Sequence, residues 1–273
     1  MKIGVRAHDF GRFSCQCQQA QTIKSAGFKC VQYAPAKAIE GIEHFDDITP
    51  QVLNRIQEGF GKNNVEITVL GCYIEPSLTD ETQRLDSVRI FKDNLSHAKK
   101  LGVPIVGTET TGLNIHATGA EREAAYNRLK DSVLRMAEKA EAEDVFIGIE
   151  PVAEHTLNTP ALTRRLLDEV GSSKLKVIFD PVNLVLPHTI HQQDMIFNEM
   201  FNLLGNEIYV MHIKDTVIED DKKAWRKIGK GVINYTLIFD WLRKHKPEIR
   251  LLREDAKIDS YKEDIAAMSR LSQ

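Results

Sequence analysis

The sequence has 273 residues, of which 42% are hydrophobic, so the chain is long enough to bury a sizeable core; lysine and arginine number 36 against 39 acidic residues, a net charge of −3. The net negative charge and the even mixture of basic and acidic residues argue against nucleic acid as a partner, because binding would have to overcome repulsion by the negatively charged phosphate backbone. No stretch approaches the roughly 18 apolar residues of a bilayer-spanning helix, and the first residues lack the apolar run of a secretion signal, so we expect a soluble, cytoplasmic protein without a membrane partner.

Eight short β-rich runs alternate along the chain with segments of helical periodicity. Each run is almost continuously apolar, which is typical of parallel strands covered on both faces. The predicted strands cover residues 2–6, 28–33, 65–73, 103–108, 145–150, 175–180, 208–213 and 249–254.

Helix signals lie between these strands. Thr49 and Thr159 each stand directly before a proline, the arrangement of a capping hydroxyl followed by proline at the first helical position. Residues 81–101 and 121–142 carry apolar side chains at helical spacing, and Gly102 stands where the first of these helices should end.

The strict alternation predicts an α/β fold, either a closed (β/α)8 TIM barrel or a doubly wound open sheet. An open sheet predicts a glycine-rich phosphate loop after the first strand, whereas the sequence after Val5 is RAHDFG. The chain length is also close to the roughly 250 residues of a typical TIM barrel. We therefore predict a single TIM-barrel domain over residues 1–273.

Four successive strands in the second half end in a residue that can ligate a metal, namely Glu150, Asp180, His212 and Glu254. In a barrel of this type the carboxyl ends of the strands meet at one mouth, so these side chains are expected to converge. Three carboxylates and one imidazole, without a thiolate, suit Mn²⁺, with Mg²⁺, Co²⁺ and Zn²⁺ as alternatives. A shared cation would offset the cost of burying the carboxylates; separate strand-end charges, each paired with a neighbouring base, are the alternative interpretation.

Short motifs surround these four residues: EP at 150–151, FDPVN at 179–183, HIKD at 212–215, RKIGKG at 226–231 and RE at 253–254. With these motifs the chain resembles the sugar isomerase and epimerase family, which has a xylose isomerase-like TIM barrel, over essentially its whole length. The resemblance implies a metal-dependent isomerase or epimerase of carbohydrate metabolism that acts on a sugar or sugar phosphate. It also implies that the four residues bind one metal ion, and that Glu150 and Glu254 are the catalytic acid and base on opposite faces of the substrate.

The implied reaction is proton transfer next to a carbonyl through a metal-stabilised enediolate. Arg226 lies in an insertion after His212 and resembles a substrate-contacting arginine of the epimerases. Lys214, Glu109 and His8 follow predicted strands, so we expect them at the mouth of the barrel, in contact with the substrate. A homo-oligomer is compatible with the sequence.

Three other functions stay open at this stage. An inosose-type dehydratase on the same scaffold shares the first proton abstraction, and a non-catalytic sugar-binding barrel would keep the pocket. The third is a DNA-repair enzyme like endonuclease IV, which builds a three-zinc cluster from additional histidines. Here Tyr73, Glu109 and Asn183 stand at strand ends or in the loop after Asp180, so the sequence disfavours that cluster.

Overall fold

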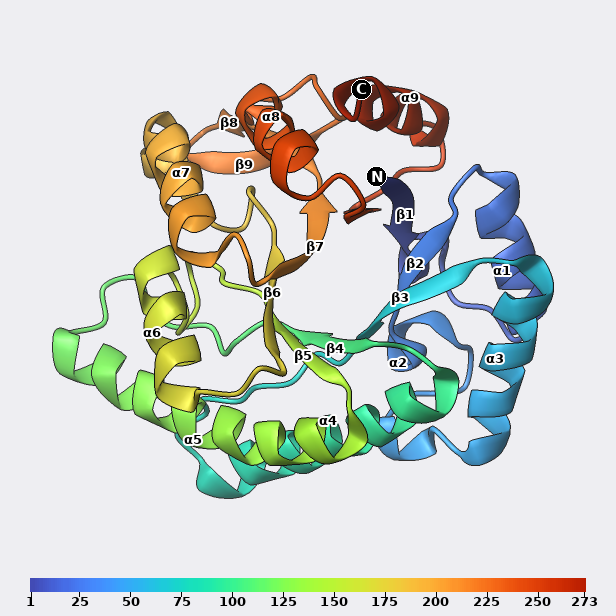
Figure 1. Cartoon of the computed structure of the whole chain (residues 1–273), viewed down its shortest axis with the longest axis horizontal. Helices are drawn as coiled ribbons and strands as arrows, with labels where there is room; N and C mark the ends of the chain where they lie inside the picture. Colours follow the sequence, from blue (N-terminus) through green and yellow to red (C-terminus); the bar gives the residue numbers. More distant parts are fainter. The chain divides into compact units, whose positions relative to one another are not determined.

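The structure is a computed structural model that describes residues 1–273. Eight parallel strands form a closed barrel in the order β1-β10-β7-β6-β5-β4-β3-β2, so the predicted α/β barrel is confirmed. All eight predicted strands are present. Their bounds are β1 Lys2–Arg6, β2 Cys30–Tyr33, β3 Glu66–Gly71, β4 Ile105–Thr108, β5 Phe146–Ile149, β6 Leu175–Phe179, β7 Ile208–Ile213 and β10 Arg250–Arg253 (Figure 1).

Nine α-helices connect or follow the strands, and none of them combines the length and the apolar composition needed to cross a bilayer. Thr49 and Thr159 cap two of them, each accepting a backbone N–H three residues on at 3.4 and 3.1 Å, as predicted. Gly102 ends another with a left-handed φ of 69°. The helices are α1 Gln16–Ser25, α2 Pro35–Ala38, α3 Pro50–Asn63, α4 Glu81–Leu101, α5 Gly119–Glu143, α6 Pro160–Val170, α7 Gln193–Leu204, α8 Tyr235–His245 and α9 Tyr261–Leu271.

The chain forms two compact units, which we describe separately. Unit 1 comprises residues 1–71 and 210–273. In it β1 pairs with both β10 and β2, β2 pairs with β3, and β10 pairs with β7, all in parallel. Helices α1 and α3 lie side by side (Figure 1). Gly59 allows this close approach, because a Cβ there would lie 2.7 Å from the backbone nitrogen of Cys17.

Unit 2 comprises residues 72–209. Its strands β4, β5 and β6 pair in sequence order, and α4 packs against α5. Arg84 of α4 joins the two helices, since its guanidinium donates to Asp131 and Ser132 of α5 at 2.7 and 2.9 Å.

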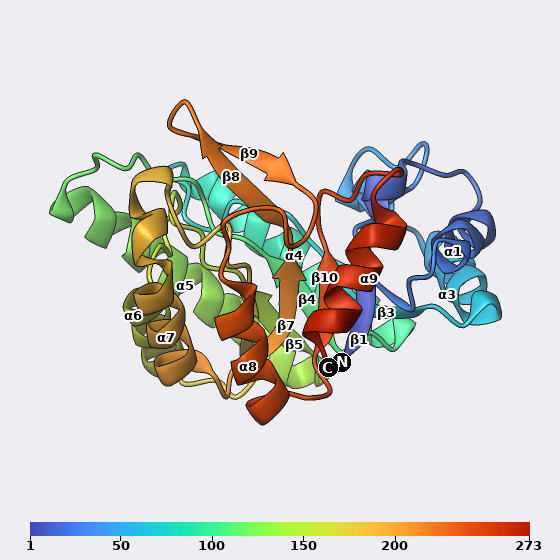
Figure 2. The ribbon, with the colours of Figure 1, turned by 90° about the horizontal axis from the view of Figure 1, so that it is seen from above.

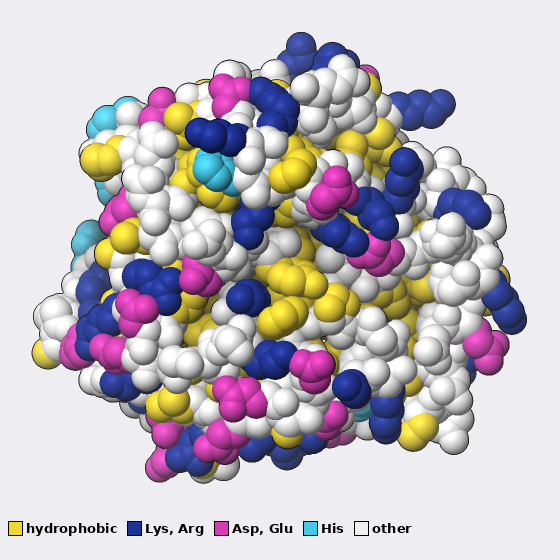
Figure 3. Space-filling model, viewed as in Figure 1, with side chains coloured by type: hydrophobic (Ala, Val, Ile, Leu, Met, Phe, Trp, Pro, Cys, Tyr) yellow, Lys and Arg dark blue, Asp and Glu magenta, His cyan; other side chains and the backbone are white.

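Where Figure 3 displays the surface, basic and acidic side chains are interspersed, in line with the mixed charge of the sequence.

The insertion after His212 forms a β-hairpin, which the sequence analysis did not predict. Strands β8 (Asp215–Glu219) and β9 (Lys222–Arg226) pair antiparallel and extend beyond the carboxyl end of β7 (Figure 2). The turn places Asp220 and Asp221 at φ values of 49° and 56°, the left-handed pair of a type I′ turn. Two aspartates are a weaker turn signal than Asn-Gly, which explains why the sequence pattern did not indicate a hairpin.

Candidate metal centre

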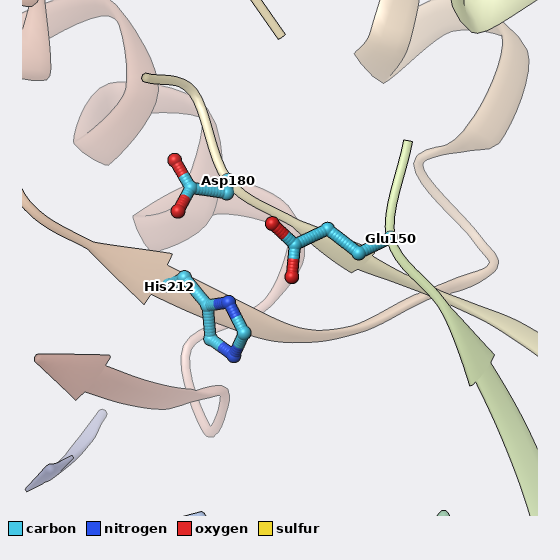
Figure 4. Close-up of side chains that lie close together, drawn as sticks. All are labelled: Glu150, Asp180 and His212. Atoms are coloured by element: carbon cyan, nitrogen blue, oxygen red, sulfur yellow. The ribbon is translucent and has the colours of Figure 1, made fainter. Parts of the chain in front are cut away.

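Two of the predicted ligands, Glu150 and Asp180, directly follow β5 and β6 in unit 2 and are 3% and 0% exposed (Figure 4). Oδ1 of Asp180 accepts the backbone N–H groups of Val182 and Asn183 at 2.8 and 2.9 Å, which fixes the start of the loop after β6. The side-chain amide of Asn183 donates to Oε1 of Glu150 at 2.6 Å. Asn183 therefore connects the loop that begins at Asp180 with the carboxylate of Glu150.

The other two predicted ligands, His212 and Glu254, belong to β7 and to the residue after β10 in unit 1. The register pairs His212 with Leu252, so Glu254 lies just beyond it on the neighbouring strand. Nδ1 of His212 is 3.3 Å from Oε1 of Glu254, and both side chains are buried. Nε2 of His212 is 2.8 Å from Oε1 of Gln32, which lies on β2.

Cations surround the carboxylate of Glu254. Its Oε2 accepts from Nζ of Lys214 at 3.2 Å and lies 3.4 Å from Nη1 of Arg6. Burial alone would raise the pKa of Glu254, but the adjacent imidazole of His212 and the positive charges of Lys214 and Arg6 outweigh it and hold the pKa well below the usual range. Glu254 is therefore ionised at neutral pH.

The donor set fits a divalent cation. Glu150 and Asp180 of unit 2 and His212 of unit 1 each offer one ligand atom of a kind that binds divalent metals (Figure 4). Metal–oxygen bonds of roughly 2.1 Å place two ligands of an octahedral ion about 3 Å apart when adjacent and about 4.2 Å apart when opposite. Glu254, with its oxygen 3.3 Å from His212, already meets the adjacent spacing.

Of the predicted substrate contacts, Lys214 lies against Glu254, whereas the guanidinium of Arg226 is engaged within the hairpin. It pairs with Glu219 of the facing strand and donates to the backbone oxygen of Trp225 at 2.8 Å. The guanidinium of Arg226 is thus already paired within the hairpin, and its predicted role as a substrate contact stays a prediction.

The remaining predicted contacts follow the ends of two strands. Glu109 comes directly after β4, and its carboxylate is 3.9 Å from Nδ1 of His155. His8 lies in the 3₁₀ turn Ala7–Phe10 that follows β1. Burial, with help from the positive charges of Arg6 and Lys37, lowers the pKa of His8 to about 3. The imidazole of His8 is therefore neutral and can both donate and accept hydrogen bonds.

Contacts with Asp215 explain why the RKIGKG motif has glycines at positions 229 and 231. Its Oδ2 accepts the N–H groups of Gly229 and Gly231 at 2.9 and 3.0 Å, and Oδ1 accepts that of Thr216 at 2.9 Å. Gly229 has a left-handed φ of 77°, and a Cβ on Gly231 would collide with the Asp215 carboxylate. The buried aspartate thus holds the loop that follows Arg226.

Sequence reasoning missed two residues of this centre. Gln32 is a single polar residue at the end of an apolar run, and nothing in its spacing pointed to His212. Arg6 ends β1, where its guanidinium also bonds Asp9 and Asp255 at 2.8 and 2.7 Å. A rule that inspects the last polar residue of every barrel strand would have found both.

A protein family described as the xylose isomerase-like TIM barrel matches residues 20–271. The chain belongs to this family. The predicted fold and the resemblance are therefore confirmed. No match was found among curated proteins.

Solved structures similar to the chain are mostly sugar epimerases, at an identity that shows the fold alone. A D-tagatose 3-epimerase-like protein has 18% identity and a TM-score of 0.79, covering 99% of this chain and 97% of that one. The 3-keto-D-glucoside 4-epimerase from E. coli has 15% identity and a TM-score of 0.76, covering 99% and 98%. A probable 3-DHS dehydratase from Bacillus anthracis has 15% identity and a TM-score of 0.75, covering 98% and 99%. Two further neighbours, at 17% and 15% identity, contain zinc and magnesium.

Proposed function

We propose that the protein is a sugar isomerase or epimerase that uses one divalent cation, held by Glu150, Asp180, His212 and Glu254 in a single domain over residues 1–273. The observation that carries the proposal is the burial of three carboxylates and an imidazole at the ends of barrel strands. Buried carboxylates are costly unless a positive charge accompanies them. Similarity to sugar epimerases supports the choice of substrate class.

Glu150 and Glu254 would lie on opposite faces of the substrate. One would remove a proton from one face, and the other would return a proton to the opposite face. Each carboxylate is held in place by a hydrogen-bond donor, Asn183 for Glu150 and Lys214 for Glu254, so each can face the substrate with one oxygen fixed. Proton transfer by a positioned carboxylate contributes about 10²–10⁴-fold to the rate.

Asp180 and His212 would mainly hold the cation. Asp180 is suited to this because two backbone amides already fix one of its oxygens. A cation bound there supplies Lewis acidity, which stabilises the negative charge that develops on the substrate when a C–H proton next to the carbonyl is removed. Mn²⁺ is the first ion to test, followed by Mg²⁺, Co²⁺ and Zn²⁺.

The substrate would be bound by polar groups around these carboxylates, with Lys214, Glu109, His8 and Arg226 as the proposed contacts. Neutral His8 suits a sugar hydroxyl, because it offers one donor and one acceptor nitrogen. Lys214 already contacts Glu254, so a hydroxyl next to that carboxylate would lie within reach of both.

The test is a panel of ketoses, ketose phosphates and inososes incubated with Mn²⁺ in D₂O and followed by NMR. The proposal expects deuterium to enter one carbon of the product and Glu254→Gln to abolish that exchange. Glu263→Gln is the matched control, because Glu263 pairs with Lys227 on the surface and should leave exchange intact. Continued exchange in Glu254→Gln, with circular dichroism unchanged, would rule out Glu254 as a proton carrier.

A dehydratase is the second candidate, and similarity to the probable dehydratase from Bacillus anthracis favours it. It shares the first proton abstraction but expels a hydroxyl group, so the NMR panel would show loss of water rather than an isomer. Counting bound Mn²⁺ separates the remaining alternatives. One ion per chain supports the proposed enzyme, none supports a sugar-binding barrel, and about three support a nuclease of the endonuclease IV type.

A further inference from the structure

Gln32 is a buried amide in an otherwise apolar strand. It lies on β2 between Val31 and Tyr33 and is 4% exposed. The pairing of β2 with β3 shifts register between Val31 and Gln32, an irregularity of the kind that redirects a side chain. A buried amide is costly unless it forms hydrogen bonds, and Oε1 of Gln32 lies 2.8 Å from Nε2 of His212.

The two ring nitrogens of His212 therefore face different groups. Nε2 faces the amide oxygen of Gln32, and Nδ1 lies 3.3 Å from Oε1 of Glu254. An amide oxygen only accepts hydrogen bonds, so Nε2 must carry a proton to bond it. In a neutral imidazole that leaves the lone pair on Nδ1, the nitrogen next to the carboxylate of Glu254.

We infer that Gln32 is a positioning residue that fixes His212 as the Nε2–H tautomer and so presents Nδ1, beside Glu254, to the divalent cation. The inference rests on the proposed metal site and adds to it a residue that contacts no metal. Partners of this kind orient a ligating histidine, and their loss typically weakens metal binding 10–100-fold.

The opposite orientation of the Gln32 amide gives a different outcome. If its NH₂ group donated to Nε2, the ring proton would move to Nδ1 and no lone pair would face Glu254. The ring would then be unable to ligate a cation next to that carboxylate. Only the accepting orientation keeps both His212 and Glu254 available to one ion.

Two substitutions at Gln32 separate an acceptor role from simple packing. Gln32→Leu keeps the size and removes the acceptor, so the Kd for Mn²⁺ measured by titration calorimetry should rise 10–100-fold. Gln32→Glu keeps an acceptor, so its Kd for Mn²⁺ should stay within about threefold of the wild-type value, well below the 10–100-fold rise expected when the partner is removed. Packing alone predicts the reverse order, because leucine is tolerated in a core better than a charged glutamate.

Ring ¹⁵N NMR gives a readout independent of activity. In Zn²⁺-loaded wild-type protein and in Gln32→Glu, His212 should show a protonated Nε2; in Gln32→Leu this signature should weaken. The matched control is Gln19→Leu, which removes another buried amide of unit 1, one that donates to the backbone oxygen of Ala38 at 3.4 Å. It should leave the Kd unchanged.

Each outcome decides a separate point. Three results would overturn the inference and leave the proposed function intact. The first is a wild-type Kd for Mn²⁺ in Gln32→Leu, and the second is an equal loss of Mn²⁺ affinity in Gln32→Leu and Gln32→Glu. The third is a protonated Nδ1 of His212 in the metal-loaded wild-type protein. A wild-type chain that binds no divalent cation would overturn both.

Discussion

The ion pair between Arg253 and Asp264 is a candidate for a stability determinant next to Glu254. Both side chains are 0% exposed, and Nε of Arg253 donates to Oδ2 of Asp264 at 2.9 Å. The same carboxylate accepts the backbone N–H of Ile228 at 3.0 Å and the hydroxyl of Ser260 at 2.8 Å. It therefore joins β10, α9 and the loop that follows Arg226.

Asp264→Asn is expected to lower the free energy of unfolding by about 3–5 kcal/mol, the cost of leaving one partner of a buried pair without its counter-charge. We expect a loss in this range because the Arg253 side chain is fully buried, so water cannot solvate its charge when the carboxylate is removed. For a chain of this size the loss corresponds to a fall in Tm of roughly 10 °C. Urea unfolding followed by far-ultraviolet circular dichroism, with calorimetry for Tm, measures both quantities.

Two comparisons make this prediction refutable. Glu263→Gln is the control, since Glu263 is adjacent in α9 but its pair with Lys227 is exposed; it should change stability little. The double variant Arg253→Met with Asp264→Leu should recover only part of the loss, because apolar replacements remove both buried charges but leave the N–H of Ile228 and the hydroxyl of Ser260 without their acceptor. If Asp264→Asn unfolds at the same urea concentration as Glu263→Gln, the buried-charge argument is wrong.

Three further predictions concern the loop, acid stability and the metal. Gly231→Ala should lower kcat/KM roughly 10–100-fold with unchanged circular dichroism, because its methyl group would displace the Asp215 carboxylate; an unaffected rate would contradict this. Hydrogen bonds from Lys130 and Arg165 lower the pKa of Glu169 from 4.5 to about 2, so their stabilising effect is complete above pH 4.5 and lost as the pH falls towards 2. Glu169→Gln should flatten the pH dependence of the urea midpoint in that window, and an unchanged slope would refute the assignment. Mn²⁺ at 100 times its Kd should raise the free energy of unfolding by about 2.7 kcal/mol, and EDTA should reverse the gain; no rise would indicate that the folded chain binds no Mn²⁺.

The strands and the proposed ligands were predictable because each depends on local pattern. Apolar runs fix the strands, and parallel strands in a barrel present their last residues at the same end, so the positions of Glu150 and Asp180 directly after β5 and β6 could be predicted without coordinates. The helix caps at Thr49 and Thr159 were predictable for the same reason, since each capping hydroxyl accepts a backbone N–H only three residues further along the chain.

What could not be predicted depends on pairs that are distant in sequence or on weak turn signals. Gln32 and His212 are 180 residues apart, and only the barrel brings them together. The pair between Arg226 and Glu219 exists because a hairpin forms at Asp220 and Asp221, a turn that lacks the usual glycine. Without the hairpin, Arg226 has no visible partner in the sequence and resembles a free substrate contact.

The two proposed proton carriers are not equivalent, and the chain itself creates the difference. Glu254 lies between Lys214 and Arg6, whereas Glu150 accepts from the neutral amide of Asn183. A carboxylate next to two cations releases a captured proton readily, so Glu254 suits the return of a proton and Glu150 suits its removal. An epimerisation uses both groups in both directions. In the proposed epimerisation, we therefore expect this asymmetry to make one epimer react faster than the other.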